Sequence, residues 1–211
     1  MEKVFGVMEE RDTENGKAAS FVDTFARLYI KNGLLKDNRK LLVLRCAVGG
    51  TGFSRNEWGV NSVLYKRLRD LTDYAINLGG DNKIVAHLWH QGEHDAFEQK
   101  RLTPKERYEY YFSHFSEQVN DFLRVYGEVP IIAGGFCSDE KKTDPQAYAA
   151  VENATKDYLS GIKTGGLVAS DGLLSNDQKI GNGDHAHFCR ESCIELGKRY
   201  FTVYCNLKNL K

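Results

Sequence analysis

Four apolar segments, each ending in glycine or polar residues, constrain the fold of this chain more than any other feature. They comprise residues 41–48, 83–89, 129–133 and 166–170. Near-continuous apolar runs of this length are typical of parallel strands that are buried on both faces. We therefore predict four buried strands.

The segments between these runs carry the spacing of amphipathic helices. Thr103 is followed by a proline at the first helical position, and Asp144 begins another segment in the same way. Alternating strands and helices with short connections predict a three-layer αβα sandwich around a central parallel sheet. The five predicted helices are residues 20–31, 61–78, 103–125, 144–159 and 190–204.

The composition is that of an ordinary globular chain and narrows the classes of function. A length of 211 residues suits a single domain, which we expect to span residues 1–211. Lysine plus arginine and aspartate plus glutamate number 29 each, which argues against nucleic acid and anionic membranes as partners. The acidic N-terminus does not resemble a secretory signal, and the five scattered cysteines fit reduced thiols. We expect a cytoplasmic protein, although a mature secreted form stays open.

Polar motifs follow several of the predicted strands. Gly49-Gly50-Thr51 follows the first, residues 90–93 follow the second, and Asp139 lies after the third. Ligands of parallel α/β sheets bind beyond the carboxyl ends of the strands. One cleft could therefore gather most of these groups.

The segment Asp184-His185-Ala186-His187 carries the strongest single signal for catalysis. It lies between a glycine-rich turn and the last predicted helix. An aspartate three residues before a histidine can turn back and hold one imidazole nitrogen, which leaves the other free to take a proton. The alternative is a surface loop with two solvated histidines, and we interpret His185 in that way.

Two further motifs offer groups that could bind an oxyanion. The backbone at Gly49 and Gly50 can approach a carbonyl closely, although a tight strand-to-helix turn is the more usual reason for such glycines. The side-chain amide of Gln91 could donate to the same oxygen, and the alternative is a polar loop. Trp58 could line the mouth of the cleft or belong to the core.

The segment around Gln91 also has a third interpretation, as a metal site. The segment offers His87, His90 and His94 with Glu93 and Asp95. His87 and His90 lie three apart on a predicted strand and so point to opposite faces, which argues against joint coordination. A metal-dependent hydrolase that uses the histidines at 90 and 94 with Glu93 stays the weakest hypothesis, and we expect no metal or cofactor.

Three segments taken together, Ala47–Trp58, Trp89–Ala96 and Asp184–Phe188, resemble the sialate O-acetylesterase-like branch of the SGNH hydrolases. The resemblance runs from about Phe21 to Phe201, and the Trp-His-Gln-Gly-Glu-x-Asp motif is specific to that branch. It implies a flavodoxin-like αβα fold and a serine esterase that removes O-acetyl groups from carbohydrate.

The resemblance also implies roles for individual residues. His187 would be the general base and Asp184 its orienting acid. Gln91 and the backbone N–H of Gly50, with that of Gly49, would bind the oxyanion. The other residues that we place in the substrate-binding site are Thr51, Glu93 and Trp58.

The chain departs from the family at the nucleophile. The family opens with a strand that leads into Gly-Gln-Ser-Asn, and no such block occurs here. Ser20 has the position of a residue at the start of a helix. Ser54 lies close to the glycine motif and does not follow the family's first strand, where the nucleophile is expected. Either Lys3–Met8 fills the first-strand position, which would make a pseudoesterase that binds glycans or regulates, or the nucleophile lies upstream of Met1. A chain that folds alone needs that segment, or a partner's strand, in the sheet.

Overall fold

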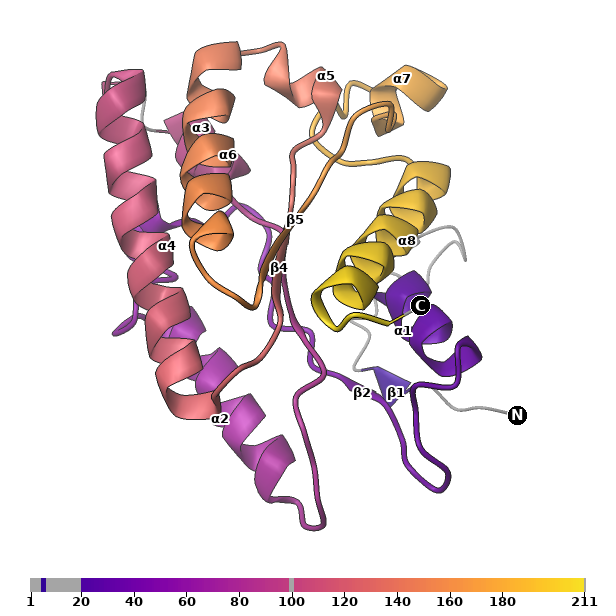
Figure 1. The fold of residues 1–211 in the computed structure, drawn as a ribbon. Helices are drawn as coiled ribbons and strands as arrows, with labels where there is room; N and C mark the ends of the chain where they lie inside the picture. The colour runs from indigo at the N-terminus through magenta and orange to yellow at the C-terminus, as the bar shows by residue number, and fades with distance from the viewer. Residues whose placement is uncertain (1–4, 7–19, 99–100, 211) are drawn as a thin grey trace.

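The computed structural model describes residues 5–6, 20–98 and 101–210. In this part of the chain, helices lie on both sides of a group of parallel strands (Figure 1). The α/β fold class predicted from the sequence is confirmed. In chain order the elements are β1 (Phe5–Gly6), α1 (Phe21–Lys31), β2 (Leu42–Val43), the 3₁₀ helix η2 (Phe53–Arg55), α2 (Val63–Asn77), β3 (His87–Trp89), α3 (Glu93–Glu98), α4 (Pro104–Tyr126), β4 (Ile131–Gly134), α5 (Ser138–Lys141), α6 (Pro145–Ser160), β5 (Gly165–Val168), α7 (Asn176–Ile180) and α8 (Arg190–Leu207).

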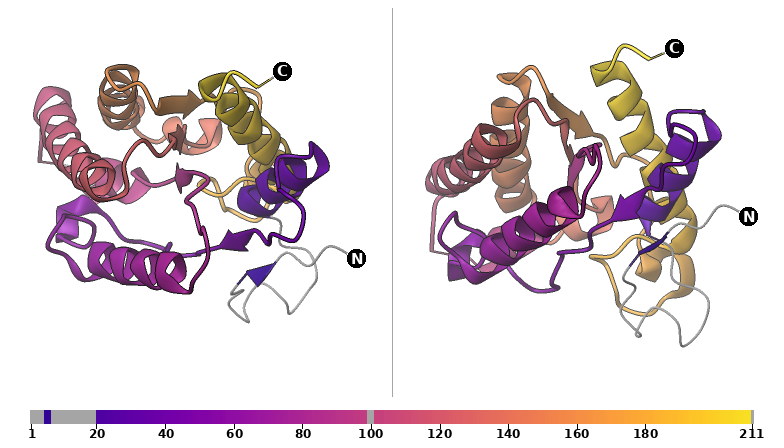
Figure 2. Two further views of the ribbon diagram at one scale, coloured as in Figure 1. Left: turned by 60° about the horizontal axis from the view of Figure 1, so that its bottom comes forward. Right: turned by 90° about the horizontal axis from the view of Figure 1, so that it is seen from below.

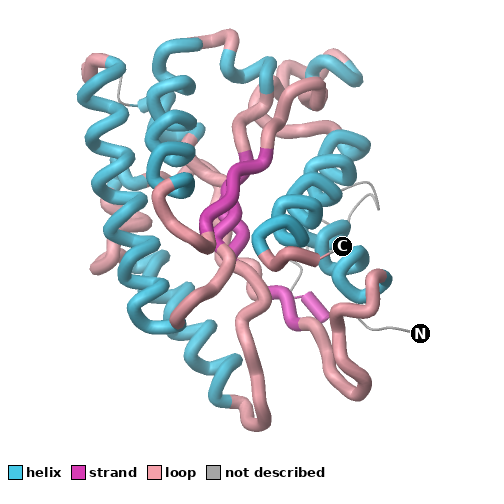
Figure 3. Tube along the Cα trace, viewed as in Figure 1, coloured by secondary structure: helices cyan, strands magenta, loops and turns pink. Residues whose placement is uncertain are grey.

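Strand β4 separates two layers of the core. Ile131 and Ala133 pack into a cluster with aromatic residues of α2, α4 and α6, whereas Ile132 packs into a second cluster with α1 and α8. Successive side chains of a strand point to opposite faces, so a strand buried on both sides needs the apolar run seen here. Figure 3 shows the strands between the two groups of helices.

The strands form two short parallel sheets rather than one continuous sheet. Strand β4 pairs with β3 and β5, and β1 pairs separately with β2. The central parallel sheet predicted from the sequence is β3-β4-β5, and β1 with β2 forms a separate two-stranded ladder in the described residues. The run at residues 83–89 forms a ladder only at His87–Trp89, where β4 lies opposite. The two sheets lie beside each other when viewed from below (Figure 2).

The first predicted strand differs most from the structure. Of residues 41–48, only Leu42–Val43 form a strand. Leu42, Leu44 and Val48 are 48%, 37% and 39% exposed, so burial on both faces is wrong for this run. Side chains of the described residues bury this strand less completely than they bury β4. Phe5–Gly6, part of the Lys3–Met8 segment proposed for the first-strand position, pairs with Leu42–Val43, and the other residues of that segment lie outside the described part.

The five helices predicted from the sequence are confirmed as α1, α2, α4, α6 and α8. Local capping groups determine where several of them begin. Ser20 accepts a hydrogen bond from the backbone of α1, and Thr103 forms a capping box with Glu106 at the start of α4. Asp144 caps α6, which has proline in its first turn. None of the described helices is long and apolar enough to cross a membrane.

Four short helical segments were not predicted. They are η2, α3, α5 and α7. They are three to six residues long, too short to show an amphipathic period. All four follow glycine-rich or polar motifs, and together they build the loops at which the candidate site lies.

Neutral His87 makes the fold sensitive to acid. Burial lowers its pKa from 6.5 to about 4, and its ring lies 4.7 Å from the ring of Phe122. The unfolded chain therefore binds one proton more than the folded chain between these pH values, so stability falls as the pH decreases from 6.5. His87→Phe, which keeps the aromatic contact, should remove this component, worth up to about 3 kcal/mol. Urea denaturation at pH 7 and near pH 4 measures it, and an equal difference between the two proteins at both pH values would show that His87 does not titrate in this way.

Candidate active site

The contact expected between Asp184 and His187 is present. His187 Nδ1 lies 2.8 Å from Asp184 Oδ1, and the His187 backbone N–H donates to the same oxygen. Because a carboxylate only accepts, Nδ1 carries the proton and Nε2 of the neutral ring keeps its lone pair. The His187 side chain is 81% exposed, and no partner of Nε2 is recorded among the described residues. The ring could therefore accept a proton from a group bound beside it.

Asp184 is held as a carboxylate by its neighbours. Its burial raises the pKa, but hydrogen bonds from Asn176 and from His187 outweigh this and lower the pKa below its usual value. Asn176 Nδ2 donates to Asp184 Oδ2 over 2.8 Å. One oxygen thus faces the imidazole and the other faces helix α7, which fixes the orientation of the carboxyl group.

The glycine motif forms a turn at Gly49-Gly50. Gly50 has a φ of +69°, a conformation that favours glycine. No acceptor for the N–H of either glycine is recorded within the described residues, so these N–H groups suit an oxyanion. Thr51 ends the turn, where its hydroxyl donates to Val48 O and accepts from the indole N–H of Trp58.

Trp58 belongs to the core. Its side chain is 4% exposed and packs edge-on to Trp89, with 5.4 Å between the ring centres. Trp58 supports the glycine turn through its hydrogen bond to Thr51, and direct contact between Trp58 and substrate stays a prediction.

Gln91 joins the two motifs. Its Nε2 donates to Thr51 O over 3.1 Å and to Asp95 Oδ2 over 2.7 Å, while Tyr111 donates to its Oε1. Both amide hydrogens therefore have protein acceptors. Donation from Gln91 to an oxyanion stays a prediction, and it requires one of these two bonds to be exchanged for the substrate.

The importance of Asp95 was not predicted from the sequence. This carboxylate is fully buried and accepts from the backbone N–H groups of Phe53 and Ser54 as well as from Gln91. Burial raises its pKa and outweighs these hydrogen bonds, which lower it. Gly52 approaches it so closely that an added Cβ would lie 2.8 Å from Oδ2. No helical periodicity links the two side chains, because Gln91 lies in the loop before α3, which begins at Glu93, and Asp95 lies within that helix.

His90 lies next to Gln91 in a defined protonation state. Tyr200 donates its one hydroxyl proton to Trp89 O, so the 3.2 Å contact between Tyr200 Oη and His90 Nδ1 requires that Nδ1 donate. Burial lowers the pKa of His90. Nε2 therefore keeps a lone pair and lies 3.7 Å from Oε1 of Glu93, the first residue of α3.

The dyad segment lies close to this second motif. The ring of Phe188, which follows His187, is 5.8 Å from the ring of His90. Burial lowers the pKa of His90 most, the carboxylates of Glu93 and Glu152 raise it, and His187 is close enough to lower it further. With the bond from Gln91 to Thr51, these contacts bring the three motifs to the carboxyl ends of the strands.

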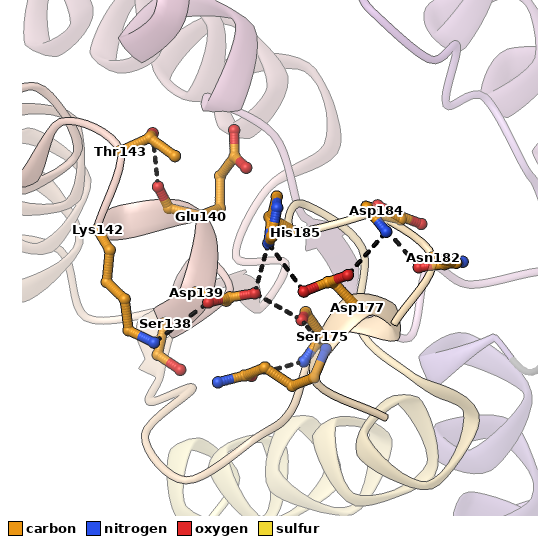
Figure 4. A network of polar contacts seen from close by, with 12 residues as sticks. Ser138, Asp139, Glu140, Lys142, Thr143, Ser175, Asp177, Asn182, Asp184 and His185 are labelled. Atoms are coloured by element: carbon orange, nitrogen blue, oxygen red, sulfur yellow. Dashed lines mark hydrogen bonds and ion pairs between the residues drawn. The ribbon is translucent and has the colours of Figure 1, made fainter. Parts of the chain in front are cut away.

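The described residues do not support the metal site considered at residues 90–94. As expected, His87 and His90 pack against different core clusters, and His94 pairs with Glu98 over 3.0 Å. His90 Nε2 lies 3.7 Å from Glu93 Oε1, but among the described residues these two and His94 do not form a group of three ligand atoms close to one another. Elsewhere among the described residues, three side chains that could bind a metal do have ligand atoms close to one another: Asp139, Asp177 and His185. There, however, His185 Nδ1 is hydrogen-bonded to Asp139, and the group forms an ion-pair network (Figure 4).

Parallel strands between two helical layers, with a histidine–aspartate pair in a loop beyond their carboxyl ends, define an α/β protein of the SGNH hydrolase fold. Among solved structures the chain is similar to one described as the crystal structure of NanS. The TM-score is 0.73 and the identity 20%, over 88% of this chain and 70% of that chain. This similarity shows the fold. The comparison with curated proteins gives no match.

Residues 7–206 match the family described as carbohydrate esterase, sialic acid-specific acetylesterase. The match covers most of the 211 residues, and the chain belongs to this family. The resemblance inferred from the three sequence motifs is thereby confirmed.

The buried Asp95 carboxylate should be required for the stability of the glycine loop. In Asp95→Asn, the amide keeps the shape of the side chain but replaces one accepting oxygen with a donor that faces N–H groups. We expect a loss of about 1–3 kcal/mol in the free energy of unfolding. Asp70→Asn is the control, because Asp70 is exposed and pairs with Lys66 on the surface of α2. Equal urea midpoints for the two variants would contradict the role given to Asp95.

Proposed function

We propose that this chain hydrolyses O-acetyl esters of carbohydrate, with O-acetylated sialic acid as the substrate class that the family description indicates. The observation that carries the proposal is the Asp184–His187 hydrogen bond in a loop next to the Gln91 motif. A neutral imidazole with one nitrogen fixed by a carboxylate and the other exposed has the geometry of a general base.

The reaction begins when a hydroxyl nucleophile attacks the acetyl carbonyl carbon. His187 Nε2 takes the hydroxyl proton as the new C–O bond forms, and Asp184 stabilises the imidazolium. The N–H of Gly50, with those of Gly49 and Gln91, stabilises the negative charge on the carbonyl oxygen. The imidazolium then protonates the sugar oxygen as the ester bond breaks, and water releases acetate from the acyl-enzyme in a second round.

The source of the nucleophilic hydroxyl is the open element of this mechanism. Among the described residues, no hydroxyl is recorded within hydrogen-bond distance of the His187 ring. Ser54, the serine nearest to the glycine motif in the sequence, is part of η2, and its backbone is bonded to Asp95. Mass spectrometry of protein quenched during turnover of p-nitrophenyl acetate would locate an acetylated hydroxyl side chain directly.

Loss of His187 should abolish most of the turnover. We expect His187→Ala to lower kcat for acetate release from acetylated sialic acid by about 10²–10⁴-fold, the usual contribution of a general base. Added imidazole should restore part of the rate, because it can enter the space left by an exposed ring. Asp171→Asn, an exposed residue in the loop after β5, is the control and should retain full activity.

Two results would contradict the esterase proposal. The first is acetate release that survives His187→Ala unchanged. The second is binding of acetylated sugar, measured by calorimetry, with no acetate release by wild-type protein. This second result would identify a pseudoesterase that keeps the cleft as a glycan-binding site.

A further inference from the structure

Asp139 and His185 form a second carboxylate–imidazole pair (Figure 4). His185 Nδ1 lies 2.8 Å from Asp139 Oδ2 and 3.5 Å from Asp177 Oδ2. His185 was expected to be a solvated histidine, and its 47% exposed side chain nevertheless has two carboxylate partners. The pair connects helix α5, which follows β4, with the loop that carries Asp184.

The same carboxylate is bonded to the start of helix α7. Ser175 Oγ donates to Asp139 Oδ2 over 2.9 Å and accepts from the backbone N–H of Gln178, so Ser175 caps the helix. Ser175 is fully buried. Asp139 therefore fixes the position of α7 as well as that of His185.

Helix α7 in turn holds the catalytic pair. The Asn176 side chain donates to Asp184 Oδ2, its backbone N–H donates to His187 O over 2.9 Å, and the Asp177 N–H donates to Asp184 O over 3.0 Å. Both members of the pair are thus bonded to the helix that Asp139 anchors.

We propose that Asp139 is a positioning residue for the Asp184–His187 pair and acts through His185 and Ser175 without touching substrate. Its catalytic consequence rests on the proposed function, whereas its structural consequence does not. Lys142 Nζ, 3.1 Å from the other Asp139 oxygen, completes the network. The hydrogen bond from His185, with that from Ser175, lowers the pKa of Asp139 to about 2, so the carboxylate is charged at neutral pH.

The first test uses proton NMR of the imidazoles and needs no turnover. Asp139→Asn and His185→Ala should each speed solvent exchange of the His187 Nδ1 proton by about tenfold, a coupling of the size found within hydrogen-bonded networks. His185→Asn should keep the slow exchange, because its amide places a donor near the former Nδ1. Asp171→Asn is the matched control and should leave the exchange unchanged.

The second test uses kinetics with the same variants. Asp139→Asn should lower kcat for acetylated sugar, by up to about 100-fold for a misplaced catalytic group, with little change in KM. The double variant Asp139→Asn/His185→Ala should lose little more than the more impaired single variant, and His185→Asn should retain most of the rate.

Three results would overturn the proposal: unchanged exchange of the His187 proton in Asp139→Asn, full additivity in the double variant, or no rescue by His185→Asn. If wild-type protein lacks turnover but the NMR results are as expected, the positioning role stands and the esterase proposal fails.

Discussion

The buried carboxylate of Asp95 is the interaction on which the arrangement of the site depends. It accepts hydrogen bonds from two backbone N–H groups of η2 and from Gln91. A buried carboxylate without such donors would be strongly unfavourable, so each of these groups stabilises the others. Through Gln91 the same network holds the Thr51 carbonyl, which places the glycine turn against the end of β3.

Two carboxylates thus hold different parts of the site. Asp95 organises the glycine turn and Gln91 from within the core, whereas Asp139 organises the loop of Asp184 and His187 from the end of β4. His187 itself is largely exposed, and its position therefore depends on its hydrogen bonds to Asp184 and Asn176, whose own positions the network fixes. This arrangement explains how an exposed imidazole can present one nitrogen in a fixed orientation while the other remains accessible.

Local chemistry made much of this architecture predictable. Thr103 and Asp144 define helix starts within a few residues, the run at 129–133 forms the buried strand β4, and the spacing of Asp184 and His187 predicts their hydrogen bond. The remainder depends on contacts between distant segments. Asp95 meets Ser54 from 41 residues away, and Asp139 meets His185 from 46 residues away, which no local pattern indicates.

For the first strand, the sequence predicted more burial than the structure has. The apolar pattern of residues 41–48 predicts burial, but burial also depends on whether a neighbouring strand and a helix cover each face. The paired part is limited to Leu42–Val43, opposite Phe5–Gly6. An apolar run alone therefore did not define how much of the segment enters the sheet.

The central claim is that three separate segments form one acetyl-binding site. Titration with acetate, the product of the proposed reaction, tests it most directly when the Gly50 amide, the Gln91 side-chain amide and the His187 ring are followed by NMR. The account predicts that all three signals shift along one saturation curve with a single Kd. A response of the His187 ring alone, or different Kd values for the three groups, would contradict it.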